Sequence, residues 1–160
     1  MEIITNNNNT KSVNIHAFCV IINNNLFRIG DIDLKVLFIG DIVGNPGRRA
    51  VKEMISLIRK EEKYDFCIAN AENAAGGSGI TYIVAQELYK AGVDVITLGN
   101  HTWSKREILN FIDSDQRIVR PVNYPKGIPG KGSTIFESDK GKIGVVNVMG
   151  RVYMDSIDCP

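Results

Sequence analysis

Three short apolar runs, about thirty residues apart, constrain the fold of this 160-residue chain most strongly. They are Val36–Ile39, Phe66–Ala69 and Val93–Leu98. Runs of this length are typical of buried β-strands, and helical spacing of apolar side chains fills the intervals between them. Alternating strands and helices predict βαβ units on a mostly parallel sheet, so we expect an α/β fold.

Local signals predict where the first two helices begin and end. Asn45 and Pro46 supply an N-cap and a first-turn proline for a helix that continues to about residue 60. A second helix is expected over about residues 81–90. Gly92 follows it, and glycine suits the left-handed turn that commonly ends a helix.

A third helix and a hairpin are expected after the third strand. Ser104 and Glu107 have the S-x-x-E spacing of a capping box, which predicts a helix that ends near Ile112. Residues 134–137 and 143–148 have strand character and are separated by a polar segment with a glycine. These two strands are expected to form a β-hairpin.

The chain divides at about residue 33. Residues 1–33 contain two asparagine runs around a short apolar segment, and such polar tracts are typical of a low-complexity, poorly ordered appendage. One strand around residues 15–22 is conceivable there. Residues 34–160 form the expected folded domain.

Composition narrows the class of partner. Nineteen basic and eighteen acidic side chains give a net charge of +1, so no global basic field indicates binding to duplex nucleic acid. A small phosphorylated substrate fits this balance better. The three cysteines form no C-x-x-C pair, and no apolar stretch approaches the roughly 18 to 20 residues that cross a bilayer. We therefore expect a cytoplasmic protein without a membrane partner.

Polar motifs follow each of the three predicted strands at the point where the strand ends. They contain Asp41, then Glu72 and Asn73, then Asn100 and His101. The carboxyl ends of parallel strands line one crevice, where ligands bind, so these side chains are expected to converge. Two carboxylates, two amides and an imidazole form a plausible set of metal ligands.

Each of these residues also has an ordinary structural interpretation. Asp41 could cap a turn, Glu72 could pair with a lysine or arginine, and His101 could be a loop histidine. The chain has no G-x-G-x-x-G, no G-x-x-x-x-G-K-[ST] and no G-x-S-x-G motif. Dinucleotide binding, P-loop chemistry and serine hydrolysis of that kind are therefore not indicated, and metal chemistry is the preferred hypothesis.

Several longer motifs resemble a known family. Residues 38–48, 71–79 and 97–103, with 120–125 and 129–132, are similar to the YmdB-type bacterial metallophosphoesterases of the calcineurin-like superfamily. The resemblance covers about residues 34–151. It implies that residues 34–160 are the N-terminal half of a metallophosphoesterase domain, an incomplete sandwich of two sheets. It also implies a phosphodiesterase that hydrolyses 2′,3′-cyclic nucleotides.

The resemblance further implies a role for each candidate residue. Asp41 would bind one metal, Glu72 both metals and Asn100 the second, with Asn73 in or just outside this shell. The cofactors would be two divalent or mixed-valence metal ions, with iron as the first expectation and manganese as the second. A hydroxide that bridges the metals would attack phosphorus, and His101 would be the proton donor.

The chain departs from the family pattern in its histidines. The family has further histidine ligands in its second half, whereas this chain contains only His16 and His101. We therefore expect a truncated enzyme with impaired activity; the alternative is a non-catalytic regulatory or ligand-binding relative. Half of a sandwich would also expose apolar sheet surface, so we expect a chain that is poorly soluble or forms a homo-oligomer.

Overall fold

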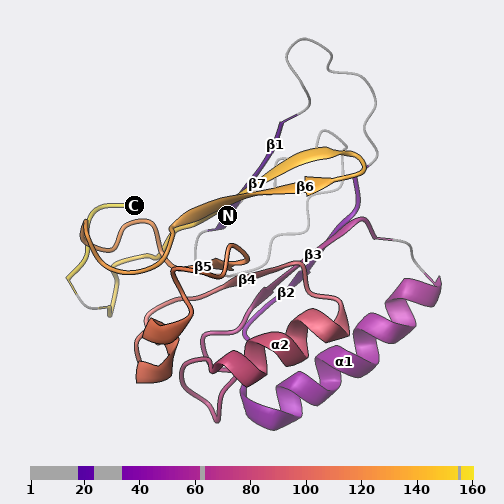
Figure 1. The fold of residues 1–160 in the computed structure, drawn as a ribbon, viewed down its shortest axis with the longest axis horizontal. Helices are drawn as coiled ribbons and strands as arrows, with labels where there is room; N and C mark the ends of the chain where they lie inside the picture. Colours follow the sequence, from indigo (N-terminus) through magenta and orange to yellow (C-terminus); the bar gives the residue numbers. More distant parts are fainter. Residues whose placement is uncertain (1–17, 24–33, 62–63, 155) are drawn as a thin grey trace.

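The computed structural model describes residues 18–23, 34–61, 64–154 and 156–160 (Figure 1). Its first sheet has four parallel strands in the order β2-β3-β4-β5. These strands are β2 (Val36–Ile39), β3 (Phe66–Asn70), β4 (Val95–Thr97) and β5 (Ile118–Val119). The predicted α/β class and all three predicted strands are confirmed, although β4 is shorter than the run 93–98 suggested.

The first two predicted helices are also confirmed. Helix α1 (Gly44–Glu61) follows β2, and α2 (Tyr82–Ala91) follows β3. Thr81 caps α2 because its hydroxyl accepts a hydrogen bond from the Val84 backbone N–H at 3.3 Å. Gly92 ends α2 with φ 111°, which is a left-handed conformation that favours glycine. No helix in the described ranges has both the length and the apolar character needed to cross a membrane.

The third predicted helix is wrong in type and extent. Residues after β4 form only a short 3₁₀ helix, η1 (Arg106–Asn110), and Lys105 precedes it without a capping side-chain bond. Glu107 Oε1 instead accepts a hydrogen bond from the backbone N–H of Tyr82 at 3.0 Å. The carboxylate predicted to complete a capping box thus binds the first residue of α2, and the box does not form.

The second sheet is antiparallel, with strand order β1-β7-β6. Strands β6 (Ser133–Ser138) and β7 (Gly141–Asn147) form the predicted hairpin. Strand β1 (Phe18–Asn23) pairs with β7 over six residue pairs and matches the strand considered around residues 15–22. The remainder of the predicted appendage, 1–17 and 24–33, lies outside the described residues.

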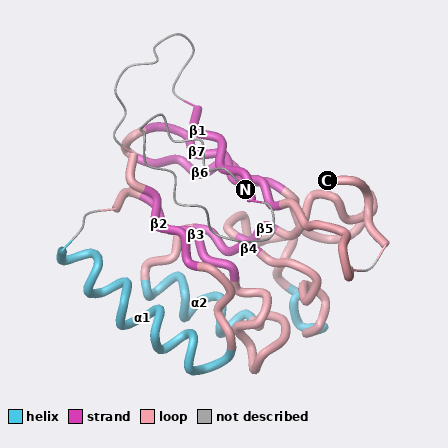
Figure 2. Tube along the Cα trace, turned by 180° about the vertical axis from the view of Figure 1, so that it is seen from behind, coloured by secondary structure: helices cyan, strands magenta, loops and turns pink. Residues whose placement is uncertain are grey.

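The parallel sheet is covered on both faces. Helices α1 and α2 lie on one side of it and the β6–β7 hairpin on the other, and Figures 1 and 2 show this layering from opposite directions. The helical side buries Ile55, Cys67 and Leu88. The side between the sheets buries Ile68 and Val145. This arrangement fits the expected two-sheet sandwich with helices outside and leaves the strand ends as the open edge.

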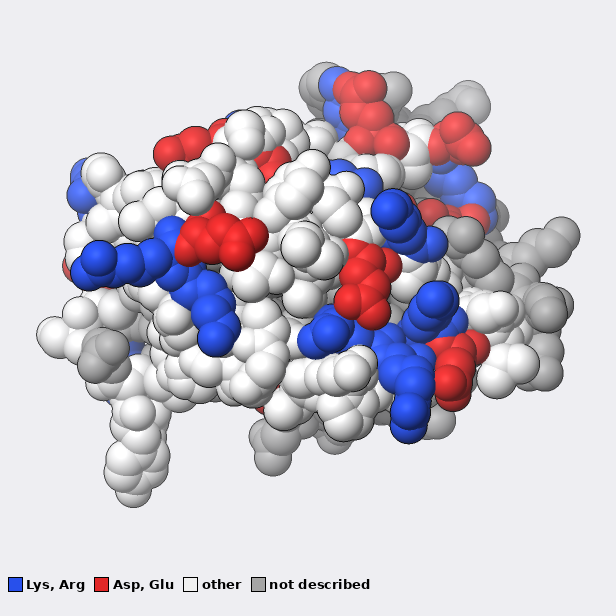
Figure 3. Space-filling view, turned by 60° about the horizontal axis from the view of Figure 1, so that its bottom comes forward, with Lys and Arg blue, Asp and Glu red and all other residues white. Residues whose placement is uncertain are grey.

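Charged side chains do not segregate over the helical side of the molecule. On the face drawn in Figure 3, Lys and Arg side chains are interspersed with Asp and Glu. This distribution agrees with the net charge of +1 for the chain. That face therefore carries no extended field of one sign that would attract a long polyanion.

Candidate active site

The carboxyl ends of β2, β3 and β4 bring the candidate residues to one edge of the sheet. Asp41 follows β2 by two residues, Glu72 follows β3 by two residues, and His101 follows β4 by four residues. These three strands are neighbours in the sheet and run in the same direction. The predicted convergence of the three loops therefore follows directly from the topology.

The amide of Asn73 joins two of these loops to each other. Its Nδ2 lies 2.9 and 3.1 Å from the two carboxylate oxygens of Asp41, and its Oδ1 lies 2.5 Å from Nδ1 of His101. An ionised carboxylate only accepts hydrogen bonds, so the NH₂ group must face Asp41 and the carbonyl must face His101. His101 consequently carries a proton on Nδ1, and its Nε2 is the ring nitrogen left for other chemistry.

Glu72 is buried next to His101, at one end of this chain of hydrogen bonds. The residue is only 3% exposed, and its Oε2 accepts a hydrogen bond from the His101 backbone N–H at 3.1 Å. Gly99 permits this burial because a Cβ at that position would lie 2.6 Å from Glu72 Cδ. A residue with any larger side chain would therefore push the carboxylate out of place.

Asn100 is adjacent to His101 in the chain and lies at the same strand end. Its side chain is partly exposed, and it forms no hydrogen bond with another residue in the described ranges. Of the five predicted residues, the structure links Asp41, Glu72, Asn73 and His101 by hydrogen bonds and leaves the Asn100 side chain outside that network.

Backbone hydrogen bonds fix the loop that bears Glu72 and Asn73. The carbonyl of Asn73 accepts from the N–H of Gly44 at 3.0 Å and from the N–H of Gly77 at 3.1 Å. Gly77 has φ 93°, a conformation that residues with a Cβ rarely adopt. The glycine-rich segment after β3 is thus a defined turn that positions Asn73.

Arg48 is a positioning residue that the strand-end pattern does not indicate. Its Nη1 donates to the Ala74 carbonyl at 2.6 Å, and its Nε lies 2.9 Å from Glu87 Oε2. The side chain is only 16% exposed. One guanidinium therefore connects α1, the turn beside Asn73 and α2. No spacing rule identifies this contact, because it depends on how the two helices pack.

A metal ion suits the chemistry of these donors. Glu72 is a nearly buried carboxylate, and no Lys or Arg in the described ranges forms an ion pair with it. His101 Nδ1 lies 3.9 Å from Glu72 Oε2, so a protonated His101 is its ion-pair partner here. Burial of a charge is costly, and a bound cation would further offset that cost. Oxygen ligands from carboxylates and amides suit cations such as Mn²⁺ and Mg²⁺.

The carboxylates and the imidazole do not complete such a site alone. Among the described residues, no group of three or more His, Cys, Asp or Glu side chains is placed to hold one metal ion. The amides of Asn73 and Asn100 would therefore have to contribute. In this structure the Asn73 amide bridges Asp41 and His101.

Two aromatic side chains, Trp103 and Tyr124, pack beside the loop that follows β4. The Tyr124 hydroxyl donates to the Gly99 carbonyl at 3.1 Å, and the Thr102 hydroxyl donates to the same oxygen at 2.6 Å. The Tyr124 ring meets the Trp103 ring edge-on with centroids 6.0 Å apart. These contacts fix the turn that carries His101.

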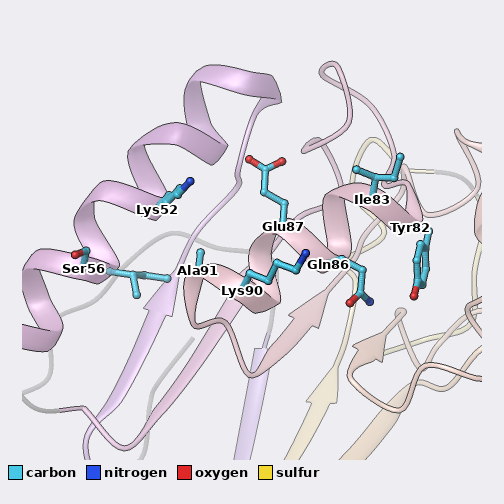
Figure 4. A pocket seen from close by; sticks show the side chains of 9 residues that line it. Lys52, Ser56, Tyr82, Ile83, Gln86, Glu87, Lys90 and Ala91 are labelled. Atoms are coloured by element: carbon cyan, nitrogen blue, oxygen red, sulfur yellow. The ribbon is translucent and has the colours of Figure 1, made fainter.

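A groove between α1 and α2 lies apart from these residues. It has a volume of about 1040 Å³ and separates α1 from α2, with Lys52 and Ser56 on one wall and Ile83 and Lys90 on the other (Figure 4). None of the strand-end residues lines it. The groove is therefore separate from the candidate site.

Comparison with known proteins identifies relatives of the chain. A family model described as YmdB-like protein matches residues 37–160. The chain is 45% identical over 127 residues to a 2′,3′-cyclic-nucleotide 2′-phosphodiesterase of Bacillus subtilis, covering 79% of this chain and 48% of that protein. It is 36% identical over 122 residues to a putative phosphatase/phosphodiesterase of Mycoplasma genitalium, covering 74% and 43%. The chain thus spans about half the length of the curated relatives it matches.

Solved structures agree with this relationship. A hypothetical protein from Thermus thermophilus is 45% identical, with a TM-score of 0.71 over 78% of this chain and 48% of that one. A novel phosphatase from Mycoplasma pneumoniae is 33% identical, with a TM-score of 0.73 over 79% and 47%.

Proposed function

The chain belongs to the YmdB-like family, and from this we propose that it carries the metal-binding and proton-donating groups of a phosphodiesterase. The proposed substrates are small phosphorylated molecules with a phosphodiester bond, in the first place 2′,3′-cyclic nucleotides. The activity named for the Bacillus subtilis relative supports this choice. The observation that carries the proposal is the hydrogen-bonded chain from Asp41 through Asn73 to His101 at the strand ends.

His101 has the role of proton donor in this proposal. Because Nδ1–H is directed at Asn73, a second proton on the ring is carried by Nε2 and is available to a leaving alkoxide. The side chain is 40% exposed, so a substrate has access to the ring. Proton transfer by a positioned imidazole contributes about 10² to 10⁴ in rate.

Asp41, Glu72 and Asn100 are the proposed metal ligands, with Asn73 in or beside that shell. Two ions are proposed, with iron first and manganese as the alternative. Bound cations would neutralise the charge that develops on the phosphoryl oxygens. Asp41 and Asn73 also orient the His101 ring through their hydrogen bonds, so they serve the imidazole as well as the metal.

Hydrolysis of a 2′,3′-cyclic nucleotide tests the proposal. The purified chain should turn over this substrate when iron or manganese is added, and His101→Ala should lower kcat by about 10² to 10⁴. His16→Ala is the matched control, because His16 is the other histidine of the chain and precedes the family match. Equal activity in the wild type and His101→Ala would contradict the role given to His101.

A second candidate is a relative that binds ligand without turnover. One observation favours it: the carboxylates and the imidazole of the described ranges form no three-residue metal cluster. Metal analysis and nucleotide binding separate the two functions. Bound nucleotide without hydrolysis, in protein loaded with metal, supports the second.

A further inference from the structure

A smaller cavity lies between η1 and the loop that follows β5. Its volume is about 330 Å³. It is lined by Trp103, Arg106, Ile108, Leu109, Ile128 and Pro129. The lining combines one flat aromatic side chain, one guanidinium and otherwise apolar groups. Sites for small molecules have volumes of about 300 to 1,000 Å³ and are lined in this way, with few polar groups.

One lining residue of the cavity, Trp103, is close in the chain to the candidate active site. Trp103 is two residues from His101, and the chain has no cis peptide in its described part, so the two Cα atoms lie at most about 7.6 Å apart. The N–H of Thr102 donates to Gly99 O and that of Ser104 to His101 O, both at 3.1 Å, which folds this segment into consecutive turns. Trp103, which forms one wall of the cavity, and His101 are therefore carried by the same run of turns.

The aromatic wall is held in place before any ligand arrives. The Trp103 ring packs against the core of the helical side and meets Tyr124 edge-on at 6.0 Å. Tyr124 is in turn fixed by its hydrogen bond to Gly99. Arg106 is exposed and forms no ion pair with any residue in the described ranges, so its guanidinium is available to a ligand.

We propose that this cavity is the subsite for the nucleobase of the substrate, with Trp103 as its stacking wall and Arg106 as its polar contact. Any of the bases can stack on an aromatic ring or a guanidinium, because every base has a π-face. In a nucleotide the base is separated from the phosphate by one sugar ring, so a base subsite is expected close to His101, and Trp103 is two residues away from it. The proposal rests on the proposed function, since its ligand is the nucleotide on which that function acts.

The cavity contains the single tryptophan of the chain, so intrinsic fluorescence reports directly on it. The metal-loaded full chain is titrated with adenosine 3′-monophosphate, and separately with ribose 5-phosphate and inorganic phosphate. We expect a saturable change in Trp103 fluorescence with adenosine 3′-monophosphate and no such change with ribose 5-phosphate or inorganic phosphate. No change with the nucleotide, or an equal change with ribose 5-phosphate, would overturn the base subsite.

One substitution and its control test the role of Arg106 in binding. Arg106→Ala should weaken nucleotide binding about 5- to 10-fold, corresponding to about 1 to 1.4 kcal/mol. Lys126→Ala removes an exposed positive charge on the neighbouring loop and should leave the affinity unchanged. Equal weakening by both substitutions would show a general charge effect and overturn the role of Arg106.

This test separates the subsite from the proposed function. Binding is measured without turnover, so a fluorescence response in a chain that hydrolyses nothing supports the subsite and opposes the phosphodiesterase. Hydrolysis of a cyclic nucleotide without any nucleotide-specific response supports the phosphodiesterase and opposes the subsite. Trp103→Phe should raise KM for the cyclic nucleotide more than it lowers kcat.

Discussion

At the level of single residues, the site depends on atoms that fit against each other with little free space. The Asn73 amide is used at both ends, by Asp41 and by His101. Glu72 has room only because residue 99 is a glycine. Short polar groups and a missing Cβ therefore determine the direction of the His101 ring and the burial of the carboxylate.

Gly99→Ala tests the packing around Glu72. The added Cβ would meet the carboxylate, so we expect a loss of about 1 to 3 kcal/mol in the free energy of unfolding and weaker metal binding. Urea denaturation and calorimetric metal titration measure the two effects. Gly150→Ala is the control, because a Cβ there would meet nothing within 4 Å. Similar small effects in both variants would contradict the tight fit.

At the level of elements, contacts between helices, turns and strands position the loops of the site. Arg48 joins α1 to the turn after β3 and to α2. Asp65, just before β3, accepts from the Lys35 backbone N–H at 2.8 Å and from Lys140 Nζ at 2.9 Å, which connects the parallel sheet to the β6–β7 turn. These contacts are hydrogen bonds and ion pairs between residues that are far apart in the sequence.

Arg48→Ala should loosen the turn that carries Asn73. The Ala74 carbonyl and the Glu87 carboxylate would lose their shared donor, so we expect about 1.5 to 3 kcal/mol of destabilisation. Amide hydrogen exchange in the turn 73–79 should also become faster. Arg49→Ala, an exposed neighbour on the same helix, should change neither quantity. Identical hydrogen exchange in both variants would contradict the role of Arg48 in positioning this turn.

Asp65 gives a pH-dependent prediction. The hydrogen bond from the Lys35 N–H holds the pKa of Asp65 below its usual value; burial opposes this effect, and the Lys140 ammonium lowers the pKa further. A lowered folded-state pKa contributes stability that is present above the unfolded pKa of about 3.9 and is lost as pH falls through the folded value. Asp65→Asn should therefore cost about 0.5 to 1 kcal/mol at pH 7.

The cost of Asp65→Asn should shrink as pH falls below about 4, measured by urea denaturation across pH. Glu137→Gln is the control, because the Lys142–Glu137 pair is far more exposed, with the two side chains 61% and 77% accessible. A cost of Asp65→Asn that stays constant from pH 7 to pH 2 would be inconsistent with this linkage.

At the level of the whole molecule, the described chain leaves apolar surface on two sides. Ile135 on β6 is 70% exposed on the outer face of the antiparallel sheet, and β6 is an edge strand among the described residues. Ile83 on α2 is 76% exposed beside the groove between the helices. Exposed apolar groups at an open sheet edge favour association.

We predict that the chain self-associates through the outer face of the antiparallel sheet. Sedimentation velocity should show a mass that rises with concentration, and Ile135→Lys should return the protein towards the monomer. Ile83→Lys is the matched substitution on the other side and should have the smaller effect. A monomer at every concentration would refute the prediction, and a larger effect of Ile83→Lys would move the interface to the helices.

The positions of β2, β3 and α2 could be predicted from the sequence because local patterns determine them. Apolar runs identify β2 and β3, and Thr81 and Gly92 bound α2 through their own conformational preferences. The convergence of the three loops follows from the parallel order of the strands. These features require no knowledge of tertiary side-chain contacts.

The remaining features depend on partners far away in sequence. Glu107 was expected to cap its own helix, yet it binds Tyr82, twenty-five positions earlier. The Asn73 bridge and the Arg48 contact depend on the orientation of side chains after packing, which residue spacing does not encode. Local signals therefore predict where the site lies, and tertiary contacts determine how its groups are joined.

The dependence of the rate on the leaving group tests the proposed role of His101 as proton donor at the strand-end site. The rates of wild type and His101→Ala are compared on a 2′,3′-cyclic nucleotide, which expels an alkoxide, and on bis(p-nitrophenyl) phosphate, which expels a stable phenolate. We predict a loss of about 10² to 10⁴ on the first substrate and less than about 10-fold on the second. Equal losses on both substrates would contradict that role.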